Sequence, residues 1–585
     1  MSKCNVNPHF LAGMKREHDD TDSQVPKRSK TDDIAERVGL TEFINKGFDP
    51  VTGEFKSRVE DFMVTEIYKD DMDCQLKSFD IPELPVEEKS KDLEETEELS
   101  DEVAAGLQKV LSKELSSYSI PVPDDKVKRT SLHKSIGSFN SLLSSETIRE
   151  GSDYAIKVTI KRTHAFGSRD KRPDKNNQYL HFTILKWNIT TSDAVLRLSK
   201  LLCTKPKNFS YAGLKDKRGI TTQRMCCRFL EPKRLLGINR PFFEANVESS
   251  DSVVYKNNYI MGDFEFSKNG LKLGDLCGNK FSIVLRDCEE TAQENLDKIR
   301  TSLLENGFIN YFGLQRFGNN GDTHEIGKFI LMKDYQSAVE RILTPNDNSK
   351  RDVVQSLNHY NTTEDAAAAL NMLSYKSSLE GLLLSSLTKE PTDFKRALKC
   401  LHHKQQTLYT HAFQSYVWNK LVSRRIRTHD MAVLAGDLVY TDQTQNEVRK
   451  LTSDEVSSYH LSDILLPMPG YDIQLPDNCC KEYISEILDQ DGMSIDDFKG
   501  PLGREFNVSG CYRNVIYKPS EFDADIIKYT DENEKLVSTN LDSILGKSFE
   551  VKNEGSRTAL RLRFTLPRSC YATMLLREIG RSDRF

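Results

Sequence analysis

The residues best suited to chemistry lie in Ala212–Gln223, AGLKDKRGITTQ, where one aspartate stands among cations. Asp216 has Lys215, Lys217 and Arg218 beside it and a glycine on either side of this cluster. A stabilising ion pair within a helix would need partners three or four residues away. A solvated turn would explain the charges. The alternative is a reactive carboxylate, since nearby cations favour the ionised form that a nucleophile or base needs.

The distribution of charge around this stretch indicates a polyanionic partner. The net charge is -6, but residues 70–102 alone hold fourteen acids and three lysines, so the other residues sum to +5. Residues 157–175 hold seven cations against two acids, and residues 205–234 hold nine against two. Such basic blocks are typical of nucleic-acid binding, although solvated basic loops would give the same pattern. The acidic segment 70–103 predicts a disordered insertion. Its charge would repel RNA, so three roles remain open: it shields a basic groove, restrains non-specific binding, or binds a partner.

Several classes of protein fit the sequence poorly. No run reaches the roughly 18 apolar residues of a membrane helix, so we expect no membrane association. The 12 cysteines form no C-x-x-C motif, which favours a reducing compartment. Cys400, His402 and His403 form the one metal-like cluster, but on a helix they cannot all face one ion. We therefore expect no metal and no cofactor.

The amino-terminal region predicts nuclear import. Residues 1–40 are polar, and the pair Lys15-Arg16 is followed after ten residues by KRSK at 27–30. Two basic clusters at this spacing are typical of a bipartite nuclear localisation signal in a disordered tail. We expect a nuclear protein with a cytoplasmic pool.

Hydrophobic periodicity predicts strands and helices in alternation, and hence an α+β or mixed-sheet architecture. We expect the strand near the carboxyl terminus to join the first sheet, which makes one domain discontinuous and another inserted within it. The predicted strands cover 55–68, 179–188, 222–230, 279–287 and the first part of 559–579. The predicted helices cover 103–117, a stretch capped by Ser192 or Asp193, 291–306 ending at Gly307, much of 335–425, and the end of 559–579.

Seven segments, in order, closely resemble the TruD family of pseudouridine synthases in its eukaryotic form. The resemblance runs from about residue 41 to 577. The acidic insertion and the amino-terminal tail depart from the bacterial pattern. The three principal segments are Ala212–Gln223, NYFGLQRFGNNGDTH at Asn310–His324 and LPRSCYATMLLRE at Leu566–Glu578. The supporting segments are Leu271–Arg286, Phe413–Asn419, Leu466–Asp472 and Ser509–Arg513.

The resemblance implies an RNA pseudouridine synthase that needs no cofactor. The family isomerises uridine within RNA, and its eukaryotic members act on position 13 and other sites of tRNA, on small nuclear RNA and on messenger RNA. We expect a monomer. The alternative is a non-catalytic RNA-binding or chaperone protein that keeps the fold. The implied fold is α+β. A discontinuous catalytic domain with a mixed sheet spans 41–335 plus 505–585 with an acidic insertion at about 70–130, and an inserted α/β domain spans 336–504.

The resemblance also implies site residues. Asp216 matches the catalytic aspartate, Asn310 the active-site asparagine and Phe312 the base-stacking phenylalanine. Lys215, Arg218 and Arg316 are further candidates for substrate binding. Several alternatives remain open. Asn310 could cap a turn, Arg316 could form a structural ion pair, and Arg577 could pair with a core acid or approach the catalytic carboxylate. Phe317, His324 and Tyr571 are expected to be packing residues.

Overall fold

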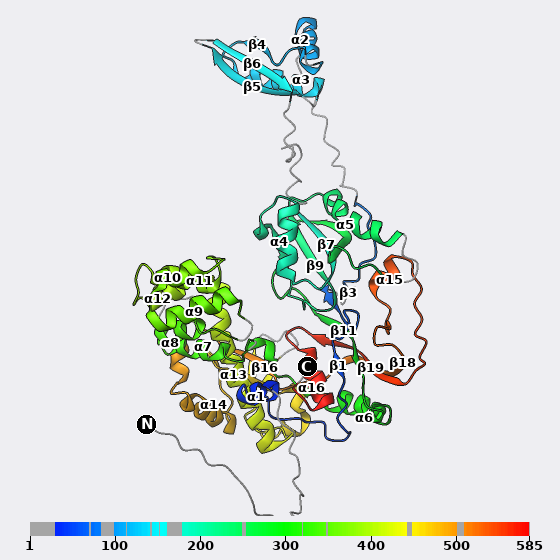
Figure 1. Cartoon of the computed structure of the whole chain (residues 1–585), viewed down its shortest axis with the longest axis vertical. Coiled ribbons are helices and arrows are strands. Elements are labelled where there is room, and N and C mark those ends of the chain that lie inside the picture. Colours follow the sequence, from blue (N-terminus) through cyan, green and yellow to red (C-terminus); the bar gives the residue numbers. More distant parts are fainter. Residues whose placement is uncertain are drawn as a thin grey trace, which may run out of the picture.

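A mixed sheet of ten strands forms the middle of the molecule (Figure 1). Its order is β10-β7-β9-β2-β11-β19-β18, with β1, β3 and β8 paired at the side. The central strands β2 and β9 are parallel, and the other pairs found in the described residues are antiparallel. The strands are β1 (Glu54–Phe55), β2 (Phe62–Tyr68), β3 (Met72–Asp73), β7 (Tyr179–Trp187), β8 (Phe209–Tyr211), β9 (Ile220–Arg228), β10 (Tyr259–Ser267), β11 (Gly278–Arg286), β18 (Ser520–Tyr529) and β19 (Arg557–Pro567).

The computed structural model describes most of the chain. The described residues are 30–69, 72–82, 99–112, 114–140, 143–150, 153–160, 178–247, 253–318, 320–346, 349–441, 447–499 and 508–583. The expected tail and nuclear signal at 1–29, most of the acidic segment at 83–98, and part of the first basic block at 161–177 lie outside them.

Strand β19 shows how the sequence pattern builds this sheet. Its alternating residues place Leu560, Leu562, Phe564 and Leu566 in the core, with at most 1% of each side chain exposed. On the other face, Arg561 lies directly opposite Asp525 of β18 and forms an ion pair with it. The expectation that the last strand joins the first sheet is confirmed, because β19 lies between β11 and β18.

Helices pack around the sheet at positions close to those predicted. Helix α6 spans Thr291–Asn306 as expected and ends at Gly307 with φ +72°. A Cβ at Gly307 would lie 2.2 Å from the carbonyl oxygen of Tyr517, so this turn requires glycine. The cap of α4 is Thr190, whose side chain accepts the Asp193 N–H, and not Ser192 or Asp193. The helices of this part are α1 (Lys30–Arg37), α4 (Thr191–Leu201), α5 (Pro232–Val247), α6, α15 (Asn540–Ile544) and α16 (Ala572–Gly580).

The insertion near the amino terminus is more ordered than expected. Residues 72–82 belong to the main unit, because β3 pairs with β2 and Leu76 is buried in the core. Residues 101–160 contain a small module in which two helices pack on a three-stranded sheet around Ile136, Ile156 and Val158. Its elements are α2 (Asp101–Leu111), β4 (Tyr118–Val122), α3 (Lys126–Phe139), β5 (Leu143–Glu150) and β6 (Asp153–Ile160).

A mostly helical part with a small sheet follows the main strands. Helix α7 packs against α13 and shares a core with the next helices, so this part begins before residue 336. Strand β16 pairs with β15, so it extends beyond residue 504. Its elements are α7 (Thr323–Leu331), α8 (Tyr335–Ile342), α9 (Arg351–Thr363), α10 (Ala366–Met372), α11 (Leu379–Leu387), α12 (Phe394–Lys399), α13 (His403–His429), α14 (Cys479–Gln490), β13 (Leu438–Tyr440), β14 (Val448–Lys450), β15 (Leu465–Met468) and β16 (Cys511–Asn514).

One continuous core joins the main sheet to the helical part. It contains Phe281 and Phe564 from the sheet together with Phe413 and Trp418 from α13. The strands β12 (Phe308–Ile309) and β17 (Ile516–Tyr517) pair beside it. Because both parts bury the same cluster, their relative position is set by packing and not by the connecting segments alone.

We predict that Asp61→Ala destabilises the main sheet. Both oxygens of Asp61 bind the guanidinium of Arg286, the last residue of β11, at 2.8 Å, and neither side chain is more than 2% exposed. Removing one partner leaves a buried charge, which costs about 3–5 kcal/mol. Chemical denaturation followed by circular dichroism should show this loss in the free energy of unfolding.

Glu244→Ala is the matched control. Glu244 pairs with Arg240 on the exposed surface of α5, where an ion pair contributes about 0.3–0.5 kcal/mol. Equal effects of the two substitutions would contradict a structural role for the Asp61–Arg286 pair.

Candidate active site

Side chains from α4 and β9 hold the loop that carries Asp216. The hydroxyl oxygen of Thr191 accepts the N–H of Lys215 at 3.1 Å, and this hydroxyl in turn donates to Oε1 of Gln223 at 2.8 Å. Nε2 of Gln223 donates to the carbonyl oxygen of Gly213 at 2.9 Å. These bonds fix the first half of the loop to the sheet.

The loop enters β9 through Gly219, which lies against β2. Gly219 has φ +145°, and a Cβ at this position would lie 2.5 Å from the carbonyl oxygen of Phe62. Only glycine allows this close approach of the two chains. This contact brings Asp216 next to the segment that precedes β2.

The side chain of Lys186, on β7, binds the backbone of the loop at the residues next to and including Asp216. Its side chain is fully buried, and its ammonium donates to the carbonyl oxygens of Ile189 at 2.9 Å, Lys215 at 3.4 Å and Asp216 at 2.7 Å. The three bonds use all three N–H groups. Burial lowers the pKa of Lys186 to about 8, and the negative charge of Asp216 opposes this shift.

The carboxylate of Asp216 is both paired and accessible. Its Oδ1 lies 3.1 Å from Nζ of Lys56, and its side chain is 39% exposed. The ammonium of Lys56 lies 3.8 Å from the centre of the Phe62 ring, a cation–π contact that fixes it in place. Among the described residues no donor reaches Oδ2, so this oxygen is open to a ligand.

The cation that pairs with Asp216 therefore comes from a distant segment and not from its neighbours. Lys215 points inward, with Nζ 2.7 Å from Oε2 of Glu66 and 2.6 Å from Oδ1 of Asn279. Because its side chain is only 4% exposed, it anchors the loop in this geometry and does not face a substrate. Arg218 is exposed and donates to the carbonyl oxygen of Ser57 at 2.9 Å.

Asn310 and Phe312 lie on a second buried cation, Arg513 of β16. The Arg513 guanidinium donates to the carbonyl oxygen and to Oδ1 of Asn310, both at 2.8 Å. Burial lowers the pKa of Arg513 from its usual value. The side chain of Asn310 also donates to the carbonyl oxygen of Asn514 at 3.1 Å, so its orientation is fixed by two contacts.

Phe312 is more enclosed than a base-stacking role would require. Its ring is 6% exposed, with the Arg513 guanidinium 4.0 Å from its centre. Trp418 and Tyr571 contact it edge-on. A Cβ at Gly313 would lie 3.3 Å from Tyr571, so the space beside this glycine is already filled.

The remaining candidates all make contacts within the protein. Nε of Arg316 donates to Oγ of Ser415 at 3.2 Å, which makes a contact with α13. Phe317 is fully buried, and His324 stacks on Tyr416 at 4.5 Å, as expected of packing residues. Arg577 pairs with Asp583 and donates to the backbone at residues 40 and 42, so it ties the amino-terminal segment to α16.

The segment 271–277 connects the two halves of the site. The N–H of Gly274 donates to the carbonyl oxygen of Ala212 at 2.8 Å, beside the Asp216 loop. The carbonyl oxygen of Gly274 accepts from Arg568, which lies shortly before Tyr571 and thus near Phe312. No hydrogen bond or ring contact among the described residues joins Asp216 directly to Asn310 or Phe312.

Two exposed side chains, Cys511 and His411, lie near Arg316 in the Asn310 and Phe312 half of the site. Desolvation by the surrounding protein raises the pKa of the Cys511 thiol and lowers that of His411, and the charge of Arg316 lowers the pKa of both groups.

The site is built from side chains of several helices and strands that lie far apart in the sequence. Three residues that sequence reasoning missed are Lys56, Lys186 and Arg513. Lys186 had a signal, as the one cation among the apolar residues that end its strand, and Arg513 lies in a segment that carried the resemblance. Lys56 had no such signal in the sequence.

Among the described residues, no group of three His, Cys, Asp or Glu side chains is placed to hold a metal. No helix in the described ranges is long and apolar enough to cross a bilayer.

The fold matches a known structure over nearly its whole length. The crystal structure described as the "Putative tRNA pseudouridine synthase D (TruD)" of Methanosarcina mazei matches 94% of this chain and 98% of its own, with a TM-score of 0.57 at 19% identity. The architecture is therefore that of a pseudouridine synthase, with the α+β arrangement and mixed sheet that the sequence predicts.

Sequence comparison defines the family. The family model of tRNA pseudouridine synthase D (TruD) matches residues 156–579. The pseudouridylate synthase 7 homolog of Homo sapiens is 34% identical over 561 residues, covering 93% of this chain and 81% of that protein. The multisubstrate pseudouridine synthase 7 of Schizosaccharomyces pombe is 28% identical over 623 residues, covering 93% and 90%. The chain belongs to the TruD family, and it is an isomerase that acts on uridines in RNA.

We predict that turnover falls as the pH rises through about 8. Above this pH the buried Lys186 loses a proton and keeps two N–H groups for three carbonyl oxygens, so the Asp216 loop loosens. In Lys186→Arg the guanidinium stays charged, so the decline should move to higher pH. Single-turnover rates on tRNA, measured for both proteins across a pH series, test this effect. Ionisation of the uracil at high pH affects both proteins equally, so it cannot account for a difference between them.

Stability provides the control, because its pH dependence has the opposite sign. The pKa of Lys186 is lower in the folded protein, so between about 8 and 10.5 the unfolded chain binds more protons and this group adds stability as pH rises. If the rate falls at alkaline pH while the free energy of unfolding does not, the loss of rate comes from loosening of the Asp216 loop and not from unfolding of the protein. Identical alkaline limbs in the two proteins would contradict the role of Lys186.

Proposed function

We propose that Asp216 is the catalytic carboxylate with which this isomerase converts uridine to pseudouridine. The observation that carries the proposal is the state of this side chain. Its backbone is bound by Lys186, one oxygen is paired with Lys56, no donor among the described residues reaches the other oxygen, and the side chain is 39% exposed. A surface carboxylate that served only solubility would not require a buried ammonium bound to its backbone, because burying a charge costs free energy.

The reaction breaks the N1–C1′ glycosidic bond and joins C1′ to C5 of the same uracil. The proton on C5 is lost and N1 gains one, so atoms and charge balance without a cofactor. Breaking the bond develops positive charge at C1′, which an adjacent carboxylate stabilises. Attack of Asp216 on C1′, attack on C6, and removal of the C2′ proton each need one ionised, accessible oxygen.

The target uridine must leave its stack before Asp216 can reach it. In this proposal the flipped nucleotide lies between the Asp216 loop and the half of the site built on Arg513. Asn310, Phe312 and Arg316 form the wall of its pocket, and Arg218 and Lys217 lie exposed beside the loop where flanking phosphates would pass. A base that stacks on Phe312 must displace part of the cover given by Arg513 or Tyr571.

The proposed substrates are tRNA, at position 13 and other sites, and also small nuclear RNA and messenger RNA. The family description names tRNA, and the name of the Schizosaccharomyces pombe relative includes the word multisubstrate. A basic stretch at 205–234 on both sides of the loop gives a surface that binds any RNA through its backbone.

We predict that Asp216→Ala abolishes pseudouridine formation while RNA affinity changes by less than about threefold, because the substitution removes no cation from the RNA-binding surface. Carbodiimide primer extension or mass spectrometry on tRNA incubated with each protein measures the product. Asp297→Ala, at a side chain that is 92% exposed on α6, is the control and should keep full activity. Equal product from Asp216→Ala and the unchanged protein would overturn the assignment.

A second proposal is nuclear localisation with a cytoplasmic pool. It rests on the two basic clusters at 15–16 and 27–30. A fluorescent fusion in eukaryotic cells should lose nuclear enrichment when Lys27, Arg28 and Lys30 are replaced by alanine. The matched control replaces Lys298, Lys333 and Lys389, three lysines in the folded part. Unchanged nuclear signal in the first fusion would contradict this proposal.

A further inference from the structure

A cavity of about 490 Å³ lies beside the catalytic loop and is not used by the reaction. It is enclosed by α4, by the short helix η3 (Pro206–Asn208), by β8, by residues 271–273 and by the start of α13. Its volume falls in the range of small-ligand sites. It spans the two parts of the molecule, since Lys404 comes from α13 and the other walls come from the main unit.

The cavity shares its walls with the segments that position Asp216. Tyr211, at the end of β8, lines the cavity and directly precedes Ala212, where the loop begins. The carbonyl oxygen of Ala212 binds the N–H of Gly274, one residue after the lining residue Leu273. A ligand chain that places one unit at Asp216 can therefore place a neighbouring unit in this cavity.

The lining is apolar and remains open to solvent. Leu196 is 49% exposed and Leu273 is 65% exposed, although both are large hydrophobic side chains. Phe209 and Tyr211 contribute aromatic rings, and within the described part of the chain the Tyr211 hydroxyl has no hydrogen-bond partner. Exposed apolar side chains gathered around a cavity mark a binding surface.

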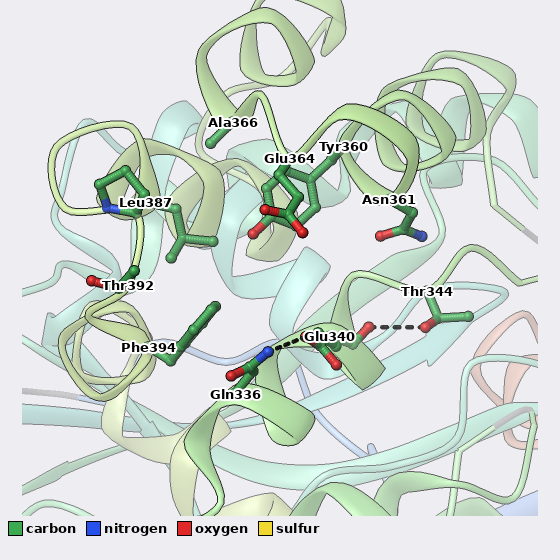
Figure 2. Close-up of a pocket in the computed structure, with 11 residues that line it drawn as sticks. Gln336, Glu340, Thr344, Tyr360, Asn361, Glu364, Ala366, Leu387, Thr392 and Phe394 are labelled. Carbon is green, nitrogen blue, oxygen red and sulfur yellow. Dashed lines mark hydrogen bonds between the residues drawn. The ribbon is translucent and has the colours of Figure 1, made fainter.

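The rim of the cavity carries positive charge only. Lys207 and Lys404 are exposed, and no ion pair to either is found among the described residues. The described residues that line the cavity include no carboxylate. Figure 2 shows a cavity of opposite character among the helices of the inserted part, where Glu340 and Glu364 line the same pocket as Tyr360. The two cavities thus differ in charge. Of the two, the cavity beside the Asp216 loop suits an anionic ligand.

We infer that the cavity beside the catalytic loop binds an unstacked nucleotide of the same RNA, next to the target uridine. The base enters the apolar cavity against Tyr211, Leu196 and Leu273, and its phosphate lies between Lys207 and Lys404. An aromatic ring with a cationic rim is the arrangement that holds single-stranded nucleic acid in many proteins. This inference rests on the proposed role of Asp216 for the position of the target uridine.

The first test introduces a negative charge into the cavity. Leu196→Asp and Leu273→Asp should each weaken tRNA binding about tenfold, the effect of losing one stacked base. Leu201→Asp is the matched control, because Leu201 lies on the same helix, is 60% exposed and does not line the cavity. Fluorescence anisotropy measures the dissociation constant, and the turnover rate of Leu196→Asp at saturating tRNA should stay within about twofold.

Charge reversal at the rim gives an independent comparison. The double variant Lys207→Glu/Lys404→Glu should lose more affinity than Lys298→Glu/Lys389→Glu, which changes the net charge equally at exposed positions elsewhere. Equal losses in both double variants, together with unchanged affinity in the two cavity leucine variants, would overturn the inference.

Photocrosslinking tests the cavity without altering it. RNA with 4-thiouridine on either side of the target is bound to full-length Asp216→Ala protein, and crosslinked peptides are identified by mass spectrometry. The expected peptides contain Tyr211 or residues 271–273, and crosslinks confined to other regions would contradict the inference. If Asp216→Ala formed pseudouridine, the catalytic assignment would fail whatever the crosslinks showed, so the two failures are distinguishable.

Discussion

The candidate site depends on a buried ammonium that binds the backbone of the Asp216 loop. In the catalytic role proposed for Asp216, the carboxylate must reach solvent while its position stays fixed, because small displacements of a reacting group cost large factors in rate. Lys186 meets both needs because its buried ammonium fixes the carbonyl oxygens of residues 215 and 216 and leaves the Asp216 side chain exposed. Its burial lowers its pKa, and the compensating interactions are the three carbonyl dipoles and the charge of Asp216.

A second buried cation organises the opposite half of the site in the same way. Arg513 binds the backbone and side chain of Asn310 and covers one face of Phe312. The segment 271–277 connects this half to the Asp216 loop. Because one hydrophobic core runs from the main sheet into α13, the two halves are held at a constant separation.

The arrangement of charge explains how a protein of net charge -6 handles a polyanion. Acidic residues concentrate at 70–102 and around the cavity of Figure 2, while the catalytic loop and the cavity beside it present lysines and arginines. Phosphates are attracted by the local field within about 10 Å and not by the net charge. The exposed cations proposed to bind RNA, such as Arg218, Lys207 and Lys404, differ from Lys186 and Arg513, the buried cations around which the site is built.

The sequence alone predicted many of the elements and indicated Asp216 as the candidate for the reactive residue. Periodicity and the terminal glycine predicted α6, alternation predicted β19, and the ordered segments pointed to Asp216, because these signals are local in the chain. Only the tertiary structure decided which groups surround that carboxylate. Its ion-pair partner Lys56 is 160 residues away, and its neighbour Lys215 turns inward to Glu66. Such pairings arise when distant strands meet in one sheet, and local patterns do not encode which strands will meet.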